Sequence, residues 1–150
     1  MSVVKNDLVG FAIADTAIAL RRAYNGRASP RGLTQVQWRV IKHIDYMPGL
    51  HQVELAERLD MDPNTLCRIL DRLEEANIVE RRRVRNDRRA WQLWLAQGAA
   101  PVLEFLNELA TELALEAFEG LDQSEIDALL ATLQRIRLNL ARPVKGAEVA

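Results

Sequence analysis

The sequence predicts a mainly α-helical fold with one small β-hairpin, and three observations lead to this prediction. Apolar residues recur at helical spacing over both ends of the 150-residue chain. Two short helical segments meet at a tight turn between residues 51 and 76. Over residues 78–95 the pattern changes to the alternation that is typical of strands. A chain of this length can bury a core without disulfides, and Cys67 is its only cysteine.

Two helices are expected before the tight turn. The first ends in the loop Gly26–Gly32, where glycine and proline interrupt the helical pattern. The second begins after Thr34, because Thr34 and Gln37 have the spacing of a capping box, in which each side chain accepts a hydrogen bond from a backbone N–H. Pro48 and Gly49 end this helix.

The next two helices form a helix-turn-helix pattern. The third helix is expected from His51 to Leu59 and the fourth from Pro63 to Ala76. Asp62 suits the N-cap of the fourth helix and Pro63 its first position, since the N–H that proline lacks would be unpaired there. The fourth helix is apolar on one side, and its other side carries polar residues, namely Asn64, Thr65, Arg68, Asp71 and Arg72.

A hairpin rich in arginine follows the fourth helix. Ile78–Val84 and Ala90–Leu95 are the predicted strands, and the connection between them, Arg85–Arg89, contains the turn signal Asn-Asp. Six of the nine residues from Arg81 to Arg89 are arginines. A hairpin at this position is a wing, and its guanidinium groups can lie along phosphates or enter the minor groove of DNA. The alternative is that the arginines form an ordinary solvated loop.

Two further helices are expected after the wing. One runs from Pro101 to Phe118, and the other starts at the capping pair Asp122 and Glu125 and continues to Leu140. Together with the first helix they present more apolar surface than a small winged core can cover, which favours association with a second copy of the chain. Residues 143–150 are expected to form a flexible tail.

The charges are separated along the chain, although the net charge is only −1. Residues 51–77 and 96–150 are acidic, whereas residues 1–50 and 78–95 are basic. This separation indicates a face for an anionic partner. No apolar segment is long enough to span a membrane and no signal peptide is found, so the sequence favours a cytoplasmic protein without a membrane partner.

No enzymatic activity, metal or cofactor is expected. His43 and His51 are isolated, and no nucleophile, carboxylate pair or glycine-rich phosphate loop has a catalytic arrangement. Cys67 lies near the start of the fourth helix and beside Arg68, where a thiolate is activated and could act as a redox sensor. The alternative is a small surface or packing residue, which the lack of a second cysteine favours.

Three consecutive segments carry a resemblance to a known family. They are LTQVQWRVIKHI, VELAERLDMDPNTLCRILDRLEEANIVERR and NDRRAWQLWLAQG, and they extend from Leu33 to Gly98. This part of the chain resembles the MarR family of bacterial transcriptional regulators. The family's usual glycine before the first wing strand is Asn77 here, which can also adopt the left-handed conformation. The family's usual threonine after the wing is Ala96, so a weaker start of the next helix is expected.

The resemblance implies a fold and a function. Residues 33–97 would form a winged helix-turn-helix DNA-binding domain, and residues 1–32 and 98–142 a helical dimerisation region. It further implies a homodimer that binds a near-palindromic operator in double-stranded DNA, and a repressor that a small aromatic or anionic effector releases. Two alternatives remain open, a winged-helix module for protein interaction and a ligand-binding helical dimer without DNA function. Neither alternative explains why arginines gather at the tip of the wing, next to the polar side of the fourth helix.

The residues predicted to contact DNA lie on the fourth helix and on the wing. They are Asn64, Thr65, Arg68, Arg72, Arg85, Arg88 and Arg89. The family resemblance implies that Arg88 or Arg89 reaches the minor groove. Asp87 is expected to hold the wing by pairing with Arg89. The alternative for Arg72 is a structural ion pair with a nearby carboxylate, that of Asp71, Glu75 or Glu80.

A pocket for a small effector is also predicted, because members of the family that the chain resembles often bind small aromatic acids between the dimer helices and the winged helix. Trp38, Tyr24 and Phe11 could stack on such a ligand, and Arg21 or Arg22 could pair with its carboxylate. Aromatic residues at helical spacing more often belong to the core. Trp38, Trp91 and Trp94 are therefore interpreted first as packing residues.

Overall fold

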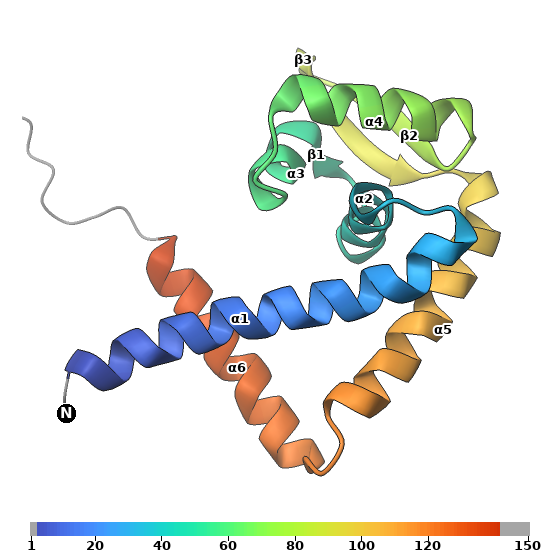
Figure 1. Ribbon diagram of the computed structural model, residues 1–150. Helices are drawn as coiled ribbons and strands as arrows, with labels where there is room; N and C mark the ends of the chain where they lie inside the picture. The colour runs from blue at the N-terminus through green and yellow to red at the C-terminus, as the bar shows by residue number, and fades with distance from the viewer. Residues whose placement is uncertain (1–2, 142–150) are drawn as a thin grey trace, which may run out of the picture. The chain divides into compact units, whose positions relative to one another are not determined.

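The computed structural model describes residues 3–141, and Figure 1 shows their arrangement in the chain. The helices and strands are α1 (Val3–Ala28), α2 (Gln35–Tyr46), β1 (Leu50–His51), α3 (Gln52–Arg58), α4 (Pro63–Glu75), β2 (Val79–Val84), β3 (Asp87–Leu95), α5 (Ala100–Ala117) and α6 (Gln123–Leu140). The chain divides into two compact units, and the boundary lies within α5, after Leu113. The first unit contains the helix-turn-helix and the hairpin, and the second contains the end of α5 and α6. The predicted tail, 143–150, lies outside the described residues.

The predicted helix starts are confirmed at three helices. At α2, the backbone N–H of Gln37 donates to Thr34 Oγ1 at 3.2 Å, and the N–H of Thr34 donates to Gln37 Oε1 at 3.0 Å. At α4, the carboxylate of Asp62 accepts from the first turn of the helix. At α6, Asp122 and Glu125 form the expected capping box. These local hydrogen bonds set where each helix begins.

The first helix extends further than predicted. Gly26 lies inside α1, because a single glycine costs a helix only about 1 kcal/mol and does not end it. The chain leaves the helix at the 3₁₀ turn Ser29–Arg31. Gly32 follows with φ 80°, a left-handed conformation that favours glycine, so the chain can turn sharply into α2.

The sheet has three antiparallel strands in the order β1–β3–β2. Strand β1 is absent from the prediction, because two residues are too few to show an alternating pattern. Leu50 pairs with Leu93, and His51 pairs with Gln92. The short strand therefore depends on its partner β3, and it ties the connection between α2 and α3 to the base of the hairpin.

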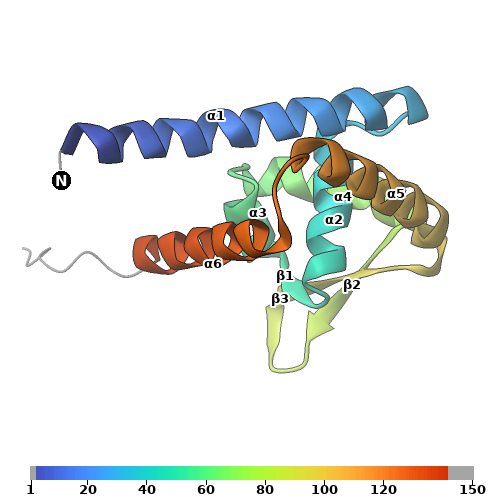
Figure 2. The same cartoon turned by 90° about the horizontal axis from the view of Figure 1, so that it is seen from below.

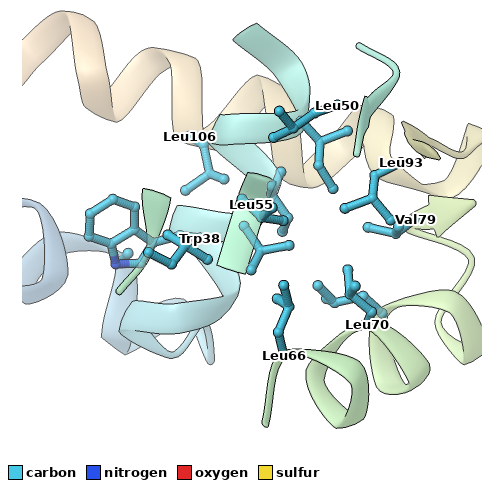
Figure 3. Close-up of a cluster of buried hydrophobic side chains, with 14 of the residues drawn as sticks. Trp38, Leu50, Leu55, Leu66, Leu70, Val79, Leu93 and Leu106 are labelled. Atoms are coloured by element: carbon cyan, nitrogen blue, oxygen red, sulfur yellow. The ribbon is translucent and has the colours of Figure 1, made fainter. Parts of the chain in front are cut away.

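The apolar faces of α2, α3, α4 and the sheet meet in one core, which α5 also covers (Figure 3). The largest fully buried side chains include Ile41, Ile44, Leu55, Leu66, Leu70, Val79, Leu93 and Leu106. Within α4, the buried residues Leu66, Leu70 and Leu73 follow one another at helical spacing. Because this face is held in the core, the polar face of α4 points outward.

The turn of the hairpin is shorter than predicted. Val84 pairs with Asp87, so only Arg85 and Asn86 form the turn, and the next three residues belong to β3. The prediction that residues 85–89 connect the strands is therefore wrong. The dipeptide Asn-Asp marks the neighbourhood of a turn, but the register of the two strands decides which residues leave the ladder.

The segments on either side of the hairpin pack closely against each other. Asn77 has φ 58°, so it adopts the left-handed conformation that the sequence suggested. A 3₁₀ turn, Gln97–Ala99, precedes α5, and its N-cap is Ala96, which provides no side-chain hydrogen bond. A Cβ atom added to Gly98 would lie 2.4 Å from the carbonyl oxygen of Asn77. The segment between the hairpin and α5 therefore lacks a hydroxyl cap, and its backbone packs closely against Asn77.

Both α1 and α6 expose apolar side chains. In α1 the large exposed ones are Leu8, Val9, Phe11, Ile13, Ile18 and Leu20. The described part of α6 contains no buried residue, and its large exposed apolar side chains are Leu129, Leu130, Leu138 and Leu140. Within residues 3–141, no helix has the length and apolar character needed to cross a membrane. Apolar surface of this extent is typical of helices that pack against a second chain.

Candidate nucleic-acid interface

The leading turns of α4 carry exposed polar side chains on a rigid backbone. Asp62 Oδ1 accepts hydrogen bonds from the N–H groups of Asn64 at 2.9 Å and Thr65 at 3.1 Å. The side chains of Asn64, Thr65 and Arg68 are exposed. They have no hydrogen bond within the described part of the chain. The helix therefore offers an amide, a hydroxyl and a guanidinium group to a partner outside the chain.

Arg81 is a structural residue that links the hairpin to α4. Its guanidinium group lies 2.5 Å from Asp71 Oδ1 and 3.0 Å from Glu74 Oε1. Its backbone N–H also donates to Glu74, at 3.1 Å. The hydrogen bond from the Arg81 side chain is the main reason that the pKa of Glu74 lies below its ordinary value. These contacts set the position of β2 relative to α4.

Cys67 lies beside the same arginine. The thiol is half-buried, and Arg81 Nη1 donates to Cys67 Sγ at 3.7 Å. Sequence reasoning did not single out Arg81. The signal was the spacing of Asp71 and Glu74, which places two carboxylates on neighbouring turns of one face of α4.

The alternative role of Arg72, an ion pair with a neighbouring carboxylate, is not supported by the structure. Asp71 pairs with Arg81, and Glu80 pairs with Arg82 at 2.8 Å. The side chain of Arg72 is exposed and forms no ion pair with any residue between 3 and 141. Arg72 therefore remains a candidate for contact with a charged partner.

Two further arginines of the hairpin are held by aromatic side chains. Arg82 pairs with Glu80 and lies over the ring of Trp94, 4.8 Å from its centroid. Arg83 lies over the ring of Trp91 at 4.3 Å, and its Nη1 donates to the carbonyl oxygen of Arg88. These distances are typical of cation–π contacts. Sequence reasoning interpreted the tryptophans only as packing residues.

The other three arginines of the hairpin are unpaired. Arg85, Arg88 and Arg89 are exposed, and their guanidinium groups form no ion pair or hydrogen bond with the described residues. The hairpin that carries them extends away from α2, α3 and α4 (Figure 2). Three cationic groups thus lie at the end of the hairpin without an ion-pair partner in residues 3–141.

Asp87 stabilises the hairpin, but by a different contact from the one expected. Its Oδ1 accepts a hydrogen bond from the backbone N–H of Arg89 at 2.9 Å. The predicted pairing of Asp87 with Arg89 is thus made by the main chain, and the guanidinium group of Arg89 stays free. A short carboxylate bonds readily to a backbone amide two residues later, and this explains the preference.

The residues predicted to line an effector pocket have separate environments. Tyr24 and Trp38 are buried, with ring centroids 4.2 Å apart, and Tyr24 Oη donates to the carbonyl oxygen of Leu106 at 2.9 Å. Burial raises the pKa of Tyr24 to about 12. Phe11 is 70% exposed and precedes Tyr24 on α1 by about 20 Å of helix. A single chain therefore does not bring Phe11 together with Tyr24 and Trp38.

Arg21 and Arg22 also differ. Arg22 is exposed, whereas Arg21 is half-buried. Burial and, to a smaller extent, the positive charge of Arg21 lower the pKa of Arg39. Two guanidinium groups therefore repel each other near the joint of α1 and α2. No cluster of three metal-ligating side chains is found among the residues that the structure describes.

A helix-turn-helix whose second helix is followed by a hairpin defines the winged-helix class of transcriptional regulators. The model of the MarR family matches residues 31–90. The apo structure of MarR from E. coli is 30% identical, with a TM-score of 0.68, and the match covers 85% of this chain and 95% of that one. The chain belongs to the MarR family of transcriptional regulators.

Two similar structures contain DNA. A mutant of E. coli MarR complexed with operator DNA is 29% identical, with a TM-score of 0.66, and the match covers 90% of this chain and 99% of that one. The transcriptional repressor CouR, bound to a 23-mer DNA duplex, is 28% identical, with a TM-score of 0.68, and the match covers 88% of this chain and 94% of that one.

Proposed function

We propose that the protein regulates transcription by binding a near-palindromic operator in double-stranded DNA. The observation that carries this proposal is the unpaired state, among the described residues, of Arg85, Arg88 and Arg89 at the end of the wing. When such a cation cluster neutralises DNA phosphates, the counterions condensed on the DNA are released, and this release favours binding. The two similar proteins with bound DNA support the proposal.

The recognition helix and the wing have different proposed roles. Asn64 and Arg68 would contact base edges in the major groove, where an amide or a guanidinium group distinguishes bases, and Thr65 would contact a phosphate. Arg72 would bind a phosphate further along the helix. Arg88 or Arg89 would enter the minor groove, and Arg85 would lie along the backbone.

We further propose a homodimer that represses its target. The exposed apolar side chains of α1 and α6 need a cover, and a second copy of the chain provides matching surfaces. Two recognition helices related by a two-fold axis would then bind the two halves of a near-palindrome. Repression fits a protein that occupies its operator in the absence of ligand.

A small anionic, and in part aromatic, effector would release the protein from DNA. The mutual repulsion of Arg21 and Arg39 favours an anion between α1 and α2, and the buried Nε1 of Trp38 has no partner within the described residues. In a panel of small aromatic carboxylates, at least one should lower the affinity for operator, and Arg21→Gln should abolish this effect. A panel without any effect would contradict this class of effector.

The DNA-binding proposal is tested by fluorescence anisotropy with the DNA around the protein's own promoter. At several salt concentrations, the logarithm of the binding constant should fall steeply with the logarithm of the salt concentration. A duplex of the same composition in random order should bind more weakly. Equal affinity for both duplexes, or an affinity that does not depend on salt, would contradict the proposal.

A further inference from the structure

One face of the wing continues the packing of the core outward. Side chains alternate along a strand, so Arg81 and Arg83 of β2 lie on the same face as the buried Val79. Arg83 pairs with Trp91 of β3, and Arg81 pairs with the buried Leu93. Along the core face of the hairpin, apolar residues at the base are therefore followed by a tryptophan that lies between arginines.

Trp91 connects this face to α4. The Arg81 guanidinium carbon is 5.9 Å from the centroid of the Trp91 ring, and Arg81 is itself paired with Asp71 and Glu74 of α4. Trp91 also lines a small cavity of about 100 Å³ together with Pro63 and Leu66 at the start of α4, and with Gln52, Val53 and Arg89. The position of the indole ring is thus set in part by α4 and by the arginine that is paired with it.

Arg83 extends these contacts to the tip of the hairpin. Its guanidinium carbon lies 4.3 Å from the centroid of Trp91, and its Nη1 donates to the carbonyl oxygen of Arg88 on the opposite strand. The strand ladder is irregular between Arg83 and Val84, just before the turn. The arginine therefore bridges the hairpin where the regular pairing of the strands is interrupted.

We propose that Arg83 is a positioning residue for DNA binding: it fixes the direction of the wing tip relative to α4 and does not itself bind a phosphate. The inference rests on the proposed function. A two-stranded hairpin is only marginally stable by itself, so its tip would otherwise sample many directions. Contacts that order Arg88 before binding reduce the entropy that binding must overcome.

Lysine cannot replace arginine in this role. A planar guanidinium group stacks on an indole ring and donates to a carbonyl oxygen at the same time, whereas an ammonium group is a compact point charge. Arg83→Lys therefore retains the charge and removes the bridge. The matched control is Arg82→Lys, because Arg82 is the neighbouring arginine of β2, lies on the other face of the hairpin and pairs with Glu80, which an ammonium group can also do.

The experiment measures operator affinity and salt dependence by fluorescence anisotropy for the parent protein, Arg83→Lys, Arg83→Gln and Arg82→Lys. Arg83→Lys should bind about three- to tenfold more weakly with an unchanged salt slope, the loss expected when one or two ordered side chains become mobile. Arg82→Lys should bind like the parent. The loss caused by Arg88→Ala should be smaller in the Arg83→Lys background, because Arg83 acts through Arg88.

Amide hydrogen exchange of the free protein adds a measurement that needs no DNA. Residues 84–89 should exchange faster in both Arg83 variants than in the parent and in Arg82→Lys. If Arg83→Lys bound the operator as tightly as the parent, and Arg83→Gln lowered the salt slope by about one unit, Arg83 would contact a phosphate. This result would overturn the inference but not the proposed function. Unchanged exchange at residues 84–89 would also overturn it. A parent protein without affinity for DNA would overturn the proposed function, and the inference with it.

Discussion

Arg81, Arg82 and Arg83 are consecutive in β2, yet each has different surroundings. Arg81 is tied to two carboxylates of α4, Arg82 pairs with Glu80, and Arg83 stacks on Trp91. The first two charges are largely compensated within the protein. The cationic surface that remains for an anionic partner is therefore concentrated at the end of the hairpin, and this surface is smaller than six arginines suggest.

Arg68 should matter for the choice of sequence. Arg68→Ala removes an exposed guanidinium group from the leading turns of α4. It should cost about 1 to 3 kcal/mol of binding free energy on the operator and less on random DNA. Competition binding with both duplexes measures this difference. An equal loss on both would assign Arg68 to a phosphate.

The wing arginines should matter for affinity on most sequences. Arg88→Ala and Arg89→Ala each remove an unpaired cation, and each should lower the salt slope by about one unit where the arginine contacts a phosphate. Asp87 continues to accept from the backbone N–H of residue 89 in both variants, so the hairpin should keep its shape. Parental binding by both variants at low and high salt would show that the wing tip is only solvated.

Glu74 should couple stability to pH. Its pKa in the folded protein is lowered from 4.5, so its contribution is complete above pH 4.5 and is lost as the pH falls through the lowered value. Its side chain is 42% exposed, so solvent screens the ion pair and Glu74→Gln should cost less than about 1 kcal/mol at pH 7. Urea unfolding of the parent and of Glu74→Gln should differ at pH 7, and the difference should shrink as the pH falls below 4.5.

The control for this pH dependence is Glu75→Gln. Glu75 is the next residue of α4, and its exposed side chain forms no ion pair with the described residues. Glu75→Gln should leave the free energy of unfolding within about 0.5 kcal/mol of the parent both at pH 7 and below pH 4.5. A Glu75→Gln variant as unstable as Glu74→Gln would mean that the net charge of α4, and not the contact with Arg81, sets the stability.

At the scale of elements, α4 and the hairpin are joined by direct contacts. Asp62 sets the start of α4, its apolar face is buried, and Arg81 joins its outer face to β2. The hairpin is closed at its base by the contact of Gly98 with Asn77. The geometry between recognition helix and wing is therefore determined by contacts within the first compact unit.

Glycine substitutions test this closure. Gly98→Ala places a Cβ 2.4 Å from a backbone oxygen, which has no flexible side chain to move away. It should lower the free energy of unfolding by about 1 to 3 kcal/mol, the cost of overpacking. Gly26→Ala is the control, because nothing lies within 4 Å of its added Cβ inside α1. It should raise stability by about 0.5 to 1 kcal/mol. Thermal unfolding that ranks the two variants in the opposite order would contradict this packing.

At the scale of the whole molecule, the exposed apolar helices predict the oligomeric state. The exposed side chains of α1 and α6 predict a particle of twice 17.0 kDa by light scattering at micromolar concentration. The double variant Leu130→Lys and Leu138→Lys should be a monomer. Both leucines are exposed on α6, and packing of the two lysines against a partner would bury two unpaired charges. Because this variant does not dimerise, its affinity for the operator should be lower than that of the parent.

The control for assembly removes an exposed aromatic side chain outside these helices. Tyr46→Ser changes a residue at the end of α2 that is 74% exposed. It should leave the mass at the dimer value. A parent protein that scatters as a monomer, or a double lysine variant that remains a dimer with full operator affinity, would exclude α6 as the dimer surface.

Local patterns were sufficient for most of the fold. The capping residues Thr34, Asp62 and Asp122 lie where the sequence placed them, because their hydrogen bonds reach only two or three residues along the chain. The apolar spacing of α4 and the left-handed Asn77 are local in the same sense. The winged helix and its family could therefore be predicted from residues that are close in sequence.

Contacts between distant residues were decided only by the folded chain. The strand β1 exists because Leu50 meets Leu93, and the register of β2 with β3 moved residues 87–89 from the turn into a strand. The same register placed Arg83 opposite Trp91 and brought Arg81 to α4. A sequence of six arginines contains no information about which carboxylate or ring each one meets, since these partners are brought together by strand pairing and core packing. This is why the sequence located the cationic wing, and tertiary structure separated its structural arginines from the free ones.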